Sequence, residues 1–264
     1  MKMDKVENAS HAILQHTGFN GKIGMIMGSG LGSIADILTE KKMLPYSKIP
    51  HYPQSSVEGH KGELIKGILN NKEVLVARGR VHCYEGYSIE EVGFPIQVFK
   101  KCGIRNIIIT NSSGSLRKEV LPGTIMTVIG HLDCTFQNLT GDPYLENKNK
   151  YHSAQLISIA KEAALANDIN VIQGNYCWTL GPAYETPAEI KYLKSINGSA
   201  VGMSTLPEIE LAGSLGLNIL TLSLLTNLAA GLSDHPLTHK EVLENASRSK
   251  DSFIKLVSSI IERI

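Results

Sequence analysis

Apolar and polar positions along the chain follow two periods, one typical of strands and one typical of helices. Compact apolar runs predict strands over residues 22–27, 106–110, 124–129, 171–179, 199–203 and 217–226, and two alternating runs, 63–69 and 73–77, predict a hairpin. Amphipathic segments predict helices over residues 6–16, 34–38, 89–102, 155–166, 190–194, 206–215 and 239–264. Because strands and helices alternate, we expect an α/β fold, a three-layer αβα sandwich with a twisted, largely parallel (mixed) central sheet.

Four of the predicted helices begin with a Ser or Thr that is followed three residues later by Glu, the pattern of a capping box. The pairs are Ser88 with Glu91, Thr186 with Glu189, Thr205 with Glu208, and Thr238 with Glu241. The unpaired N–H groups and the dipole of a helix start favour anions, and helix starts that follow strands of one sheet meet at its carboxyl edge. We therefore expect the chemistry to lie near these starts, where Tyr84, Glu185, Ser204 and His239 are found.

Composition limits the classes of partner. The 264 residues suit one large domain over residues 1–264, and no linker divides them. The formal net charge is +1 and no basic run occurs, which argues against nucleic acid and membranes. The four cysteines are too far apart for a metal motif or a disulfide framework, and the chain has neither a signal-peptide core nor an apolar run of membrane-spanning length. We expect a soluble cytoplasmic protein that binds a small molecule or another copy of itself.

A glycine-rich segment, Gly28-Ser29-Gly30-Leu31-Gly32-Ser33, follows the first predicted strand. Glycines let backbone N–H groups close on an anion, so the segment is a candidate phosphate cradle. It matches neither the dinucleotide fingerprint nor the Walker loop. A tight turn between a strand and a helix is the alternative explanation.

Two further segments place polar groups after strands. Arg80, His82 and Tyr84 lie at a spacing of two, which in an extended chain puts their side chains on one face. A solvated edge is the alternative for this set. Residues 111–115 are predicted to form a loop of small residues that would let a flat ligand or a phosphate approach the backbone.

Seven motifs occur in order along nearly the whole chain. They are Gly28-Ser29-Gly30-Leu31-Gly32, Gly59-His60, the segment Gly79 to Tyr87, Thr110-Asn111, the segment Gly181 to Thr186, the segment Val201 to Thr205, and Thr226-Asn227. In this order they resemble the trimeric purine nucleoside phosphorylases, and residues 226–234 are most similar to bacterial inosine, guanosine and xanthosine phosphorylases. The resemblance implies a homotrimer that cleaves 6-oxopurine nucleosides with inorganic phosphate and releases free base and ribose 1-phosphate, in purine salvage.

The resemblance also implies roles for individual residues at the phosphate end. Ser29, Arg80 and Ser204 would bind phosphate, with help from His60, His82 and the backbone near Ser112. Ser112 and Ser113 stand where the family usually has two alanines. Phosphate would be a co-substrate, and no metal or other cofactor is implied.

At the nucleoside end, the resemblance assigns three residues to the ribose and three to the base. Tyr84 would contact the 3′ hydroxyl, Met203 would lie under the sugar, and His239 would reach the 5′ hydroxyl. Tyr184 would pack on the base, Glu185 would bond its six-membered ring, and Asn227 would bond its 6-oxo group and the adjacent imidazole nitrogen. An aromatic residue of a neighbouring subunit is expected at the site in this family, and Tyr144 and Tyr151 are the candidates.

The chemistry of the reaction agrees with these roles. Cleavage places positive charge on the sugar and negative charge on the departing purine, so an anion is needed beside the first and hydrogen-bond donors beside the second. Asn227 supplies such a donor, and the resemblance adds His82 and Glu185, so these three are the predicted catalytic residues. In methylthioadenosine phosphorylases an Asp replaces Asn227 and a smaller apolar residue replaces His239, so a 6-oxopurine nucleoside is the preferred substrate. Xanthosine and deoxyribonucleosides are further candidate substrates.

Three other functions remain as alternatives at this point. The first is methylthioadenosine phosphorolysis. The second is a protein that binds nucleosides or anions without catalysis. The third is a hydrolase in which water replaces phosphate, although water would not need the three anion-binding groups Ser29, Arg80 and Ser204.

Overall fold

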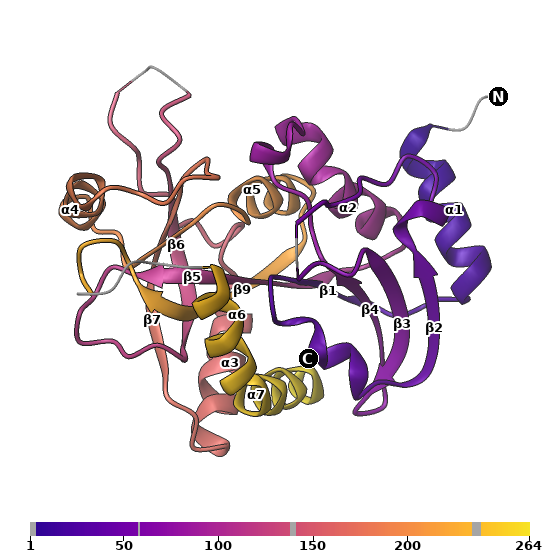
Figure 1. The fold of residues 1–264 in the computed structure, drawn as a ribbon. Coiled ribbons are helices and arrows are strands. Elements are labelled where there is room, and N and C mark those ends of the chain that lie inside the picture. The colour runs from indigo at the N-terminus through magenta and orange to yellow at the C-terminus, as the bar shows by residue number, and fades with distance from the viewer. Residues whose placement is uncertain (1–3, 58, 138–140, 234–238) are drawn as a thin grey trace.

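A mixed sheet of nine strands, shown in Figure 1, forms the centre of the described chain. The computed structural model describes residues 4–57, 59–137, 141–233 and 239–264, and the side chains of residues 239–241 are also outside the description. The strands are β1 (Ile23–Met27), β2 (Thr39–Pro45), β3 (Glu63–Leu69), β4 (Lys72–Arg78), β5 (Asn106–Ser115), β6 (Thr124–Asp133), β7 (Val171–Trp178), β8 (Ala200–Gly202) and β9 (Asn218–Leu228).

The strand order is β2-β3-β4-β1-β5-β8-β7-β6-β9, and β9 also pairs with β5. Strands β5, β8, β7, β6 and β9 therefore pair around a closed circuit. Strands β4, β1, β5 and β9 run parallel to one another, whereas β8 is antiparallel to β5 and β6 is antiparallel to β9. The predicted hairpin is the β3–β4 pair. The largely parallel, mixed sheet is thus confirmed.

Helices cover both faces of the sheet (Figure 1). Helices α1 (Lys5–Thr17), α2 (Ile89–Lys101) and α5 (Leu206–Ser214) lie on one side. Helices α3 (Ala154–Ala166), α6 (His239–Arg248) and α7 (Lys250–Arg263) lie on the other, and α4 (Pro187–Ser195) packs near β6 and β7. The expected three-layer αβα arrangement is confirmed.

Successive side chains of a strand point to opposite faces of the sheet, so a single strand contributes to both hydrophobic cores. On β1, Met25 and Met27 belong to the core under α3 and α7, whereas Ile26 belongs to the core under α1, α2 and α5. On β5, Ile108 faces the first core and Ile107 faces the second. These strands read as continuous apolar runs because both of their faces are buried.

Two of the predicted capping boxes are confirmed and one is wrong. Ser88 and Thr186 each accept the backbone N–H of the Glu three residues later, at the starts of α2 and α4. Thr205 precedes α5, but its side chain does not cap the helix and its backbone has a positive φ. Its partner Glu208 is instead buried beside Arg80. The box starting at Thr238 lies outside the described residues.

Three other expectations are corrected, and one strand was missed. Residues 34–38 are not an α-helix, because a 3₁₀ helix spans Gly32–Asp36. Residues 111–115 continue β5, since β8 and β9 pair with their backbone. The last helix is two helices, α6 and α7, with Ser249 between them. Strand β2 was not predicted, because it is an edge strand whose residues are nearly all exposed and it lacks an apolar period.

No helix among the described residues is long and apolar enough to cross a bilayer. All four cysteines are free thiols, and three of them are buried. These free thiols agree with the prediction that the four cysteines form no disulfide framework.

Two histidines form a buried pair away from the carboxyl edge of the parallel strands. Nδ1 of His131 lies 2.9 Å from Nε2 of His152, and the side chains are 1% and 4% exposed. The carboxylate of Glu210 lies 3.8 Å from the other ring nitrogen of His131. Burial, and then the neighbouring His131, lower the pKa of His152 to about 3. In the folded protein His152 is therefore neutral at pH values where it would be protonated in the unfolded chain.

This pair predicts acid sensitivity. Below pH ~6.5 the unfolded chain binds a proton at His152 that the folded protein does not, so the free energy of unfolding falls by about 1.4 kcal/mol per pH unit from this group. His152→Gln keeps a polar atom near the position of Nε2 but does not titrate. Urea unfolding between pH 7 and 4.5 should show a shallower loss of stability in the variant. Parallel curves for the two proteins would contradict the prediction.

Candidate active site

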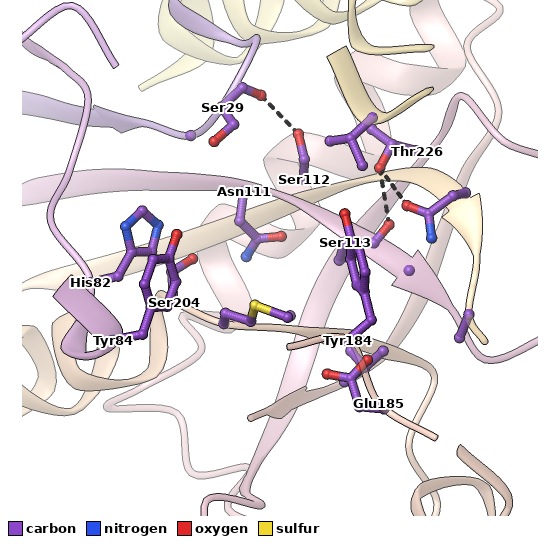
Figure 2. Close-up of a pocket in the computed structure, with 18 of the residues that line it drawn as sticks. Ser29, His82, Tyr84, Asn111, Ser112, Ser113, Tyr184, Glu185, Ser204 and Thr226 are labelled. Carbon is purple, nitrogen blue, oxygen red and sulfur yellow. Dashed lines mark hydrogen bonds between the residues drawn. The ribbon is translucent and has the colours of Figure 1, made fainter. Parts of the chain in front are cut away.

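A pocket opens where the carboxyl ends of β1, β4, β5 and β9 approach the segments that follow β7 and β8. All the predicted site residues whose side chains the structure describes line it: Ser29, His60, Arg80, His82, Tyr84, Ser112, Tyr184, Glu185, Met203, Ser204 and Asn227. Figure 2 shows Tyr184 and Glu185 well apart from Ser29, His82 and Ser204. The pocket therefore has two chemically different ends.

The guanidinium of Arg80 dominates the first end. It is 4% exposed and follows β4. Its Nε donates to the buried Glu208 at 3.2 Å, and Nη1 donates to the carbonyl oxygen of Thr110 at 2.7 Å. Nη2 is buried and has no hydrogen-bond partner within the part of the chain that the structure describes. Since Arg80 lines the pocket, these remaining N–H groups suit an anion bound there.

Glu208 is the counter-ion of this guanidinium. The carboxylate is 1% exposed, on the first turn of α5. Burial raises the pKa of Glu208, and the adjacent Arg80 opposes that rise. A guanidinium stays charged in proteins, so removing Glu208 would leave a buried charge without its partner.

Thr205 joins Arg80 to Ser204 through an unusual backbone conformation. Its φ is 78° and its ψ is −40°, and the residue is fully buried. For a β-branched residue this conformation costs about 1–3 kcal/mol. In return, the Thr205 hydroxyl lies 3.0 Å from Nη1 of Arg80 and 3.0 Å from the hydroxyl of Ser204. This backbone conformation therefore places the Thr205 hydroxyl within hydrogen-bond distance of both anion-binding groups, Arg80 and Ser204.

The glycine-rich turn after β1 forms the next wall. A Cβ on Gly28 would lie 2.7 Å from Cα of Asn111, so only glycine fits against β5. The Ser29 hydroxyl lies 3.2 Å from Nε2 of His60. The Ser112 hydroxyl donates to the carbonyl oxygen of Ser29 at 2.8 Å, as the dashed line in Figure 2 shows. Ser112 therefore ties the turn to the sheet.

His82 and Tyr84 stack on one another, with ring centroids 4.7 Å apart and an angle of 14° between the rings. Figure 2 shows both side chains beside Ser204. Nδ1 of His82 lies 2.8 Å from the Glu85 carboxylate. Burial, opposed by the hydrogen bond to Glu85 and reinforced by Arg80, lowers the pKa of His82. The neutral ring thus donates from Nδ1 to Glu85 and keeps Nε2 as an acceptor. Burial, and then Glu85, raise the pKa of Tyr84 to about 12, so its hydroxyl remains a donor at neutral pH.

The second end combines an aromatic ring, a carboxylate and an amide. Thr179 donates to the Glu185 carboxylate at 2.6 Å. Thr226 donates to Oδ1 of Asn227 at 2.9 Å, and Nδ2 of Asn227 donates to the carbonyl oxygen of Leu228 at 3.0 Å. The Thr179 hydroxyl thus positions the Glu185 carboxylate. The Thr226 hydroxyl and the Leu228 carbonyl position the Asn227 amide, and one N–H of that amide remains.

Such an arrangement can hold an anion at one end and a flat polar ring at the other. Among the described residues, no three His, Cys, Asp or Glu side chains form a group suited to a metal ion. The absence of a metal or other cofactor stays a prediction.

Comparisons with known proteins agree with this geometry. The model of the phosphorylase superfamily matches residues 22–262. The chain is 38% identical over 265 residues to purine nucleoside phosphorylase 1 of Bacillus subtilis (strain 168), covering 98% of both chains, and 37% identical to that of Geobacillus stearothermophilus, covering 100% of this chain and 99% of the relative. The chain belongs to the purine nucleoside phosphorylase family. The solved purine nucleoside phosphorylase of Schistosoma mansoni in complex with inosine has a TM-score of 0.90 at 33% identity, over 100% of this chain and 97% of that one.

Several placements on this phosphorylase differ from the expected ones. Strand β4 ends at Arg78, so Arg80, His82 and Tyr84 do not share a strand face. They meet at the pocket because the backbone leaves the sheet and enters the short 3₁₀ helix Cys83–Glu85. The side chain of His239 lies outside the described residues, so its predicted role is untested. Of the two aromatic candidates for a neighbouring site, Tyr144 is 71% exposed, whereas the ring of Tyr151 packs against His131 within its own chain.

Sequence analysis missed the residues that hold the lining groups in place. They are Glu85, Asn111, Thr179, Glu208 and Ser223. Three of them stood in segments that the sequence singled out, although without this role: Glu85 in the segment Gly79 to Tyr87, Asn111 in the motif Thr110-Asn111, and Glu208 in the predicted capping box of Thr205. The partners of the others are distant in sequence or are ordinary small polar residues.

Gly181 supports the floor of the pocket and gives a test of the site. Its φ is +75°, and a Cβ there would lie 2.5 Å from Sδ of Met203 and 2.9 Å from the ring of Tyr84. Gly181→Ala should displace both side chains and lower kcat/KM for inosine by about tenfold or more, the kinetic equivalent of ~1.4 kcal/mol.

Gly216→Ala is the matched control for this variant. Gly216 has a φ of +67°, and a Cβ there would meet nothing within 4 Å. Both variants carry the same kind of backbone strain, but only the first should change the kinetics. Equal losses of kcat/KM in the two would show that strain, and not the pocket floor, is responsible.

Proposed function

We propose that the protein catalyses the reversible phosphorolysis of 6-oxopurine nucleosides. Inosine and guanosine are the substrates, with xanthosine and the deoxy forms as further candidates. The observation that carries the proposal is the polarity of the pocket: the open N–H groups of Arg80 and the hydroxyl of Ser204 lie at one end, and Glu185 and Asn227 lie at the other. This polarity matches a reaction that joins an anion to a sugar and releases a purine.

In the proposed reaction, a phosphate oxygen attacks the anomeric carbon of the ribose, and the bond from that carbon to the purine nitrogen breaks. The bonding electrons leave with the purine, which then takes up a proton. Phosphate held by Arg80 and Ser204 stabilises the positive charge that develops on the sugar. The remaining N–H of Asn227 stabilises the negative charge on the purine.

Asn227 also supports the choice of base. Its carboxamide has one N–H left to donate to a 6-oxo group, and its oxygen can accept from the neighbouring ring nitrogen once that nitrogen has taken up a proton. Purine nucleoside phosphorylases from Schistosoma have been solved in complex with inosine, guanosine and hypoxanthine, and one is in complex with adenosine. Binding of adenosine alone therefore does not identify a substrate, and turnover is the decisive measurement.

The remaining parts of the proposal concern the setting of the enzyme. We expect a single phosphorylase domain, a homotrimer, a cytoplasmic location in purine salvage, and no cofactor other than the co-substrate phosphate. The exposed Tyr144 supports an aromatic contribution to a neighbouring subunit. Light scattering in solution, which distinguishes one chain from three, tests the assembly.

The first experiment follows release of base from inosine, guanosine, xanthosine and adenosine, each with and without inorganic phosphate. We expect cleavage of inosine and guanosine that depends on phosphate, with adenosine inert. Cleavage without phosphate would indicate a hydrolase. Turnover of methylthioadenosine, assayed in parallel, would favour the related phosphorylases. A protein that binds nucleosides but cleaves none would be a binding protein.

Asn227→Ala tests the charge on the departing base. A single preorganised donor to developing charge contributes about 10²–10³ in rate, so kcat for inosine should fall by that factor while KM changes little. Asn218→Ala, at the exposed start of the same strand, is the control and should retain full activity. A variant that loses affinity but not kcat would place Asn227 in binding alone.

A further inference from the structure

A line of buried polar groups connects the interior of the sheet to the end of the pocket that holds Arg80 and Ser204, which we call the anion end. It runs from Ser113 on β5 to Ser223 on β9, back to Asn111 on β5, and on to Thr205 and Ser204. The consecutive polar atoms are 2.6, 2.5, 3.0 and 3.0 Å apart. The first four of these residues are each at most 4% exposed, and Ser204 lines the pocket. We call these five residues the hydroxyl line.

The chemistry of the amide sets the direction of these hydrogen bonds. Oδ1 of Asn111 can only accept, so Ser223 gives its single hydroxyl proton to Asn111. Ser223 then has no proton left for Ser113, so Ser113 must donate to Ser223. On the other side of the amide, Nδ2 of Asn111 can only donate, so Thr205 accepts.

Arg80 fixes the next bond in the line. Nη1 has two protons, of which one goes to the carbonyl oxygen of Thr110 at 2.7 Å. The other lies between Thr205 at 3.0 Å and Ser204 at 3.2 Å. Thr205 therefore accepts from both Asn111 and Arg80, and its own proton is left for Ser204.

The end of the line is the hydroxyl of Ser204. This oxygen accepts from Thr205 and shares a proton of Arg80, so its own proton is left for the neighbouring hydroxyl of Tyr176 or for an anion in the pocket. We propose that the hydroxyl line is a positioning device: Ser223 fixes the orientation of the Asn111 amide, and the amide makes Ser204 a donor to phosphate. The proposal rests on the proposed function and extends it to Ser223 and Thr205, which do not line the pocket and act through Asn111 and Ser204.

The anion end therefore presents hydrogen-bond donors before phosphate binds. If Asn111 were turned by half a rotation, Oδ1 would face Thr205, and the Thr205 proton would go to Asn111. Ser204 would then donate to Thr205 and present an oxygen lone pair to the phosphate. In this second arrangement Ser223 would accept from the amide nitrogen and donate to Ser113. Ser113, whose hydroxyl bonds only to Ser223 among the described residues, would then lose the acceptor for its own proton, so the first arrangement is favoured. Preorganised donors avoid rearrangement when the anion binds.

Ser223→Ala tests the proposal. Without the Ser223 proton, the amide of Asn111 is free to turn, and Ser204 is no longer held as a donor. We expect KM for phosphate to rise by about tenfold, the loss of one hydrogen bond to a charged group. KM for inosine, and kcat at saturating phosphate, should each stay within about twofold of the wild type, because the line acts on anion binding. Calorimetry with inorganic phosphate alone should show the same loss of affinity.

Two further variants separate direction from packing. Thr221→Val removes another buried hydroxyl from β9, one without a hydrogen-bond partner among the residues described, and should leave KM for phosphate unchanged. Ser113→Ala removes the donor to Ser223 but leaves the Ser223 proton on Asn111, so its effect on KM should be smaller than that of Ser223→Ala. Thermal unfolding of each variant checks that the fold persists.

The outcomes separate this proposal from the function on which it rests. A wild-type protein without phosphate-dependent cleavage would overturn the proposed function. An active wild type with an unchanged KM for phosphate in Ser223→Ala would overturn the hydroxyl line alone. Equal rises in KM for Ser113→Ala and Ser223→Ala, or a rise in KM for inosine equal to that for phosphate, would show that packing and not hydrogen-bond direction is involved.

Discussion

The buried guanidinium of Arg80 is the constraint on which the rest of the site depends. A charge taken out of water must be paired and hydrogen-bonded, or it destabilises the fold. Glu208, Thr110 and Thr205 satisfy part of that requirement, and Nη2 is left for a ligand. Arg80 is therefore a buried cation whose hydrogen bonds are not all made within the described part of the chain. A bound anion completes it, which explains why a segment as strained as Thr205 is retained next to it.

The fold supplies these partners from distant parts of the chain. Arg80 follows β4, Thr110 lies on β5, and Glu208 lies on α5, which begins shortly after β8. Parallel neighbours bring their carboxyl ends to one edge, and the short antiparallel pairing of β8 with β5 brings Ser204 and Thr205 to that same edge. The closed circuit of strands β5, β8, β7, β6 and β9 thus fixes the distance between the two sides of the anion end.

The sequence predicts the parts of this structure that depend on local patterns. Apolar runs located eight of the nine strands, and Ser88 and Thr186 marked helix starts correctly because a capping box is made within four residues. The box at Thr205 failed for a physical reason: Glu208 is drawn to Arg80, which is 128 residues away in the chain. The pocket lining followed from motifs at strand ends. Thr179 and Ser223, and the positioning role of Asn111, could not be found, since a buried polar residue differs from an exposed one only in its tertiary partners.

Neutral hydroxyls around a single cation suit the chemistry better than further charges would. Additional Lys or Arg residues would hold phosphate more tightly, but they would also oppose the positive charge that develops on the sugar. Oriented hydroxyl dipoles bind the anion and leave its negative charge available to the sugar. A hydroxyl can either donate or accept a hydrogen bond, however, so neighbouring groups must fix which of the two it does. In this protein an amide, which has one end of each kind, can impose it on Thr205 and Ser204. The few buried polar residues behind the pocket therefore determine what the lining residues present to the ligand.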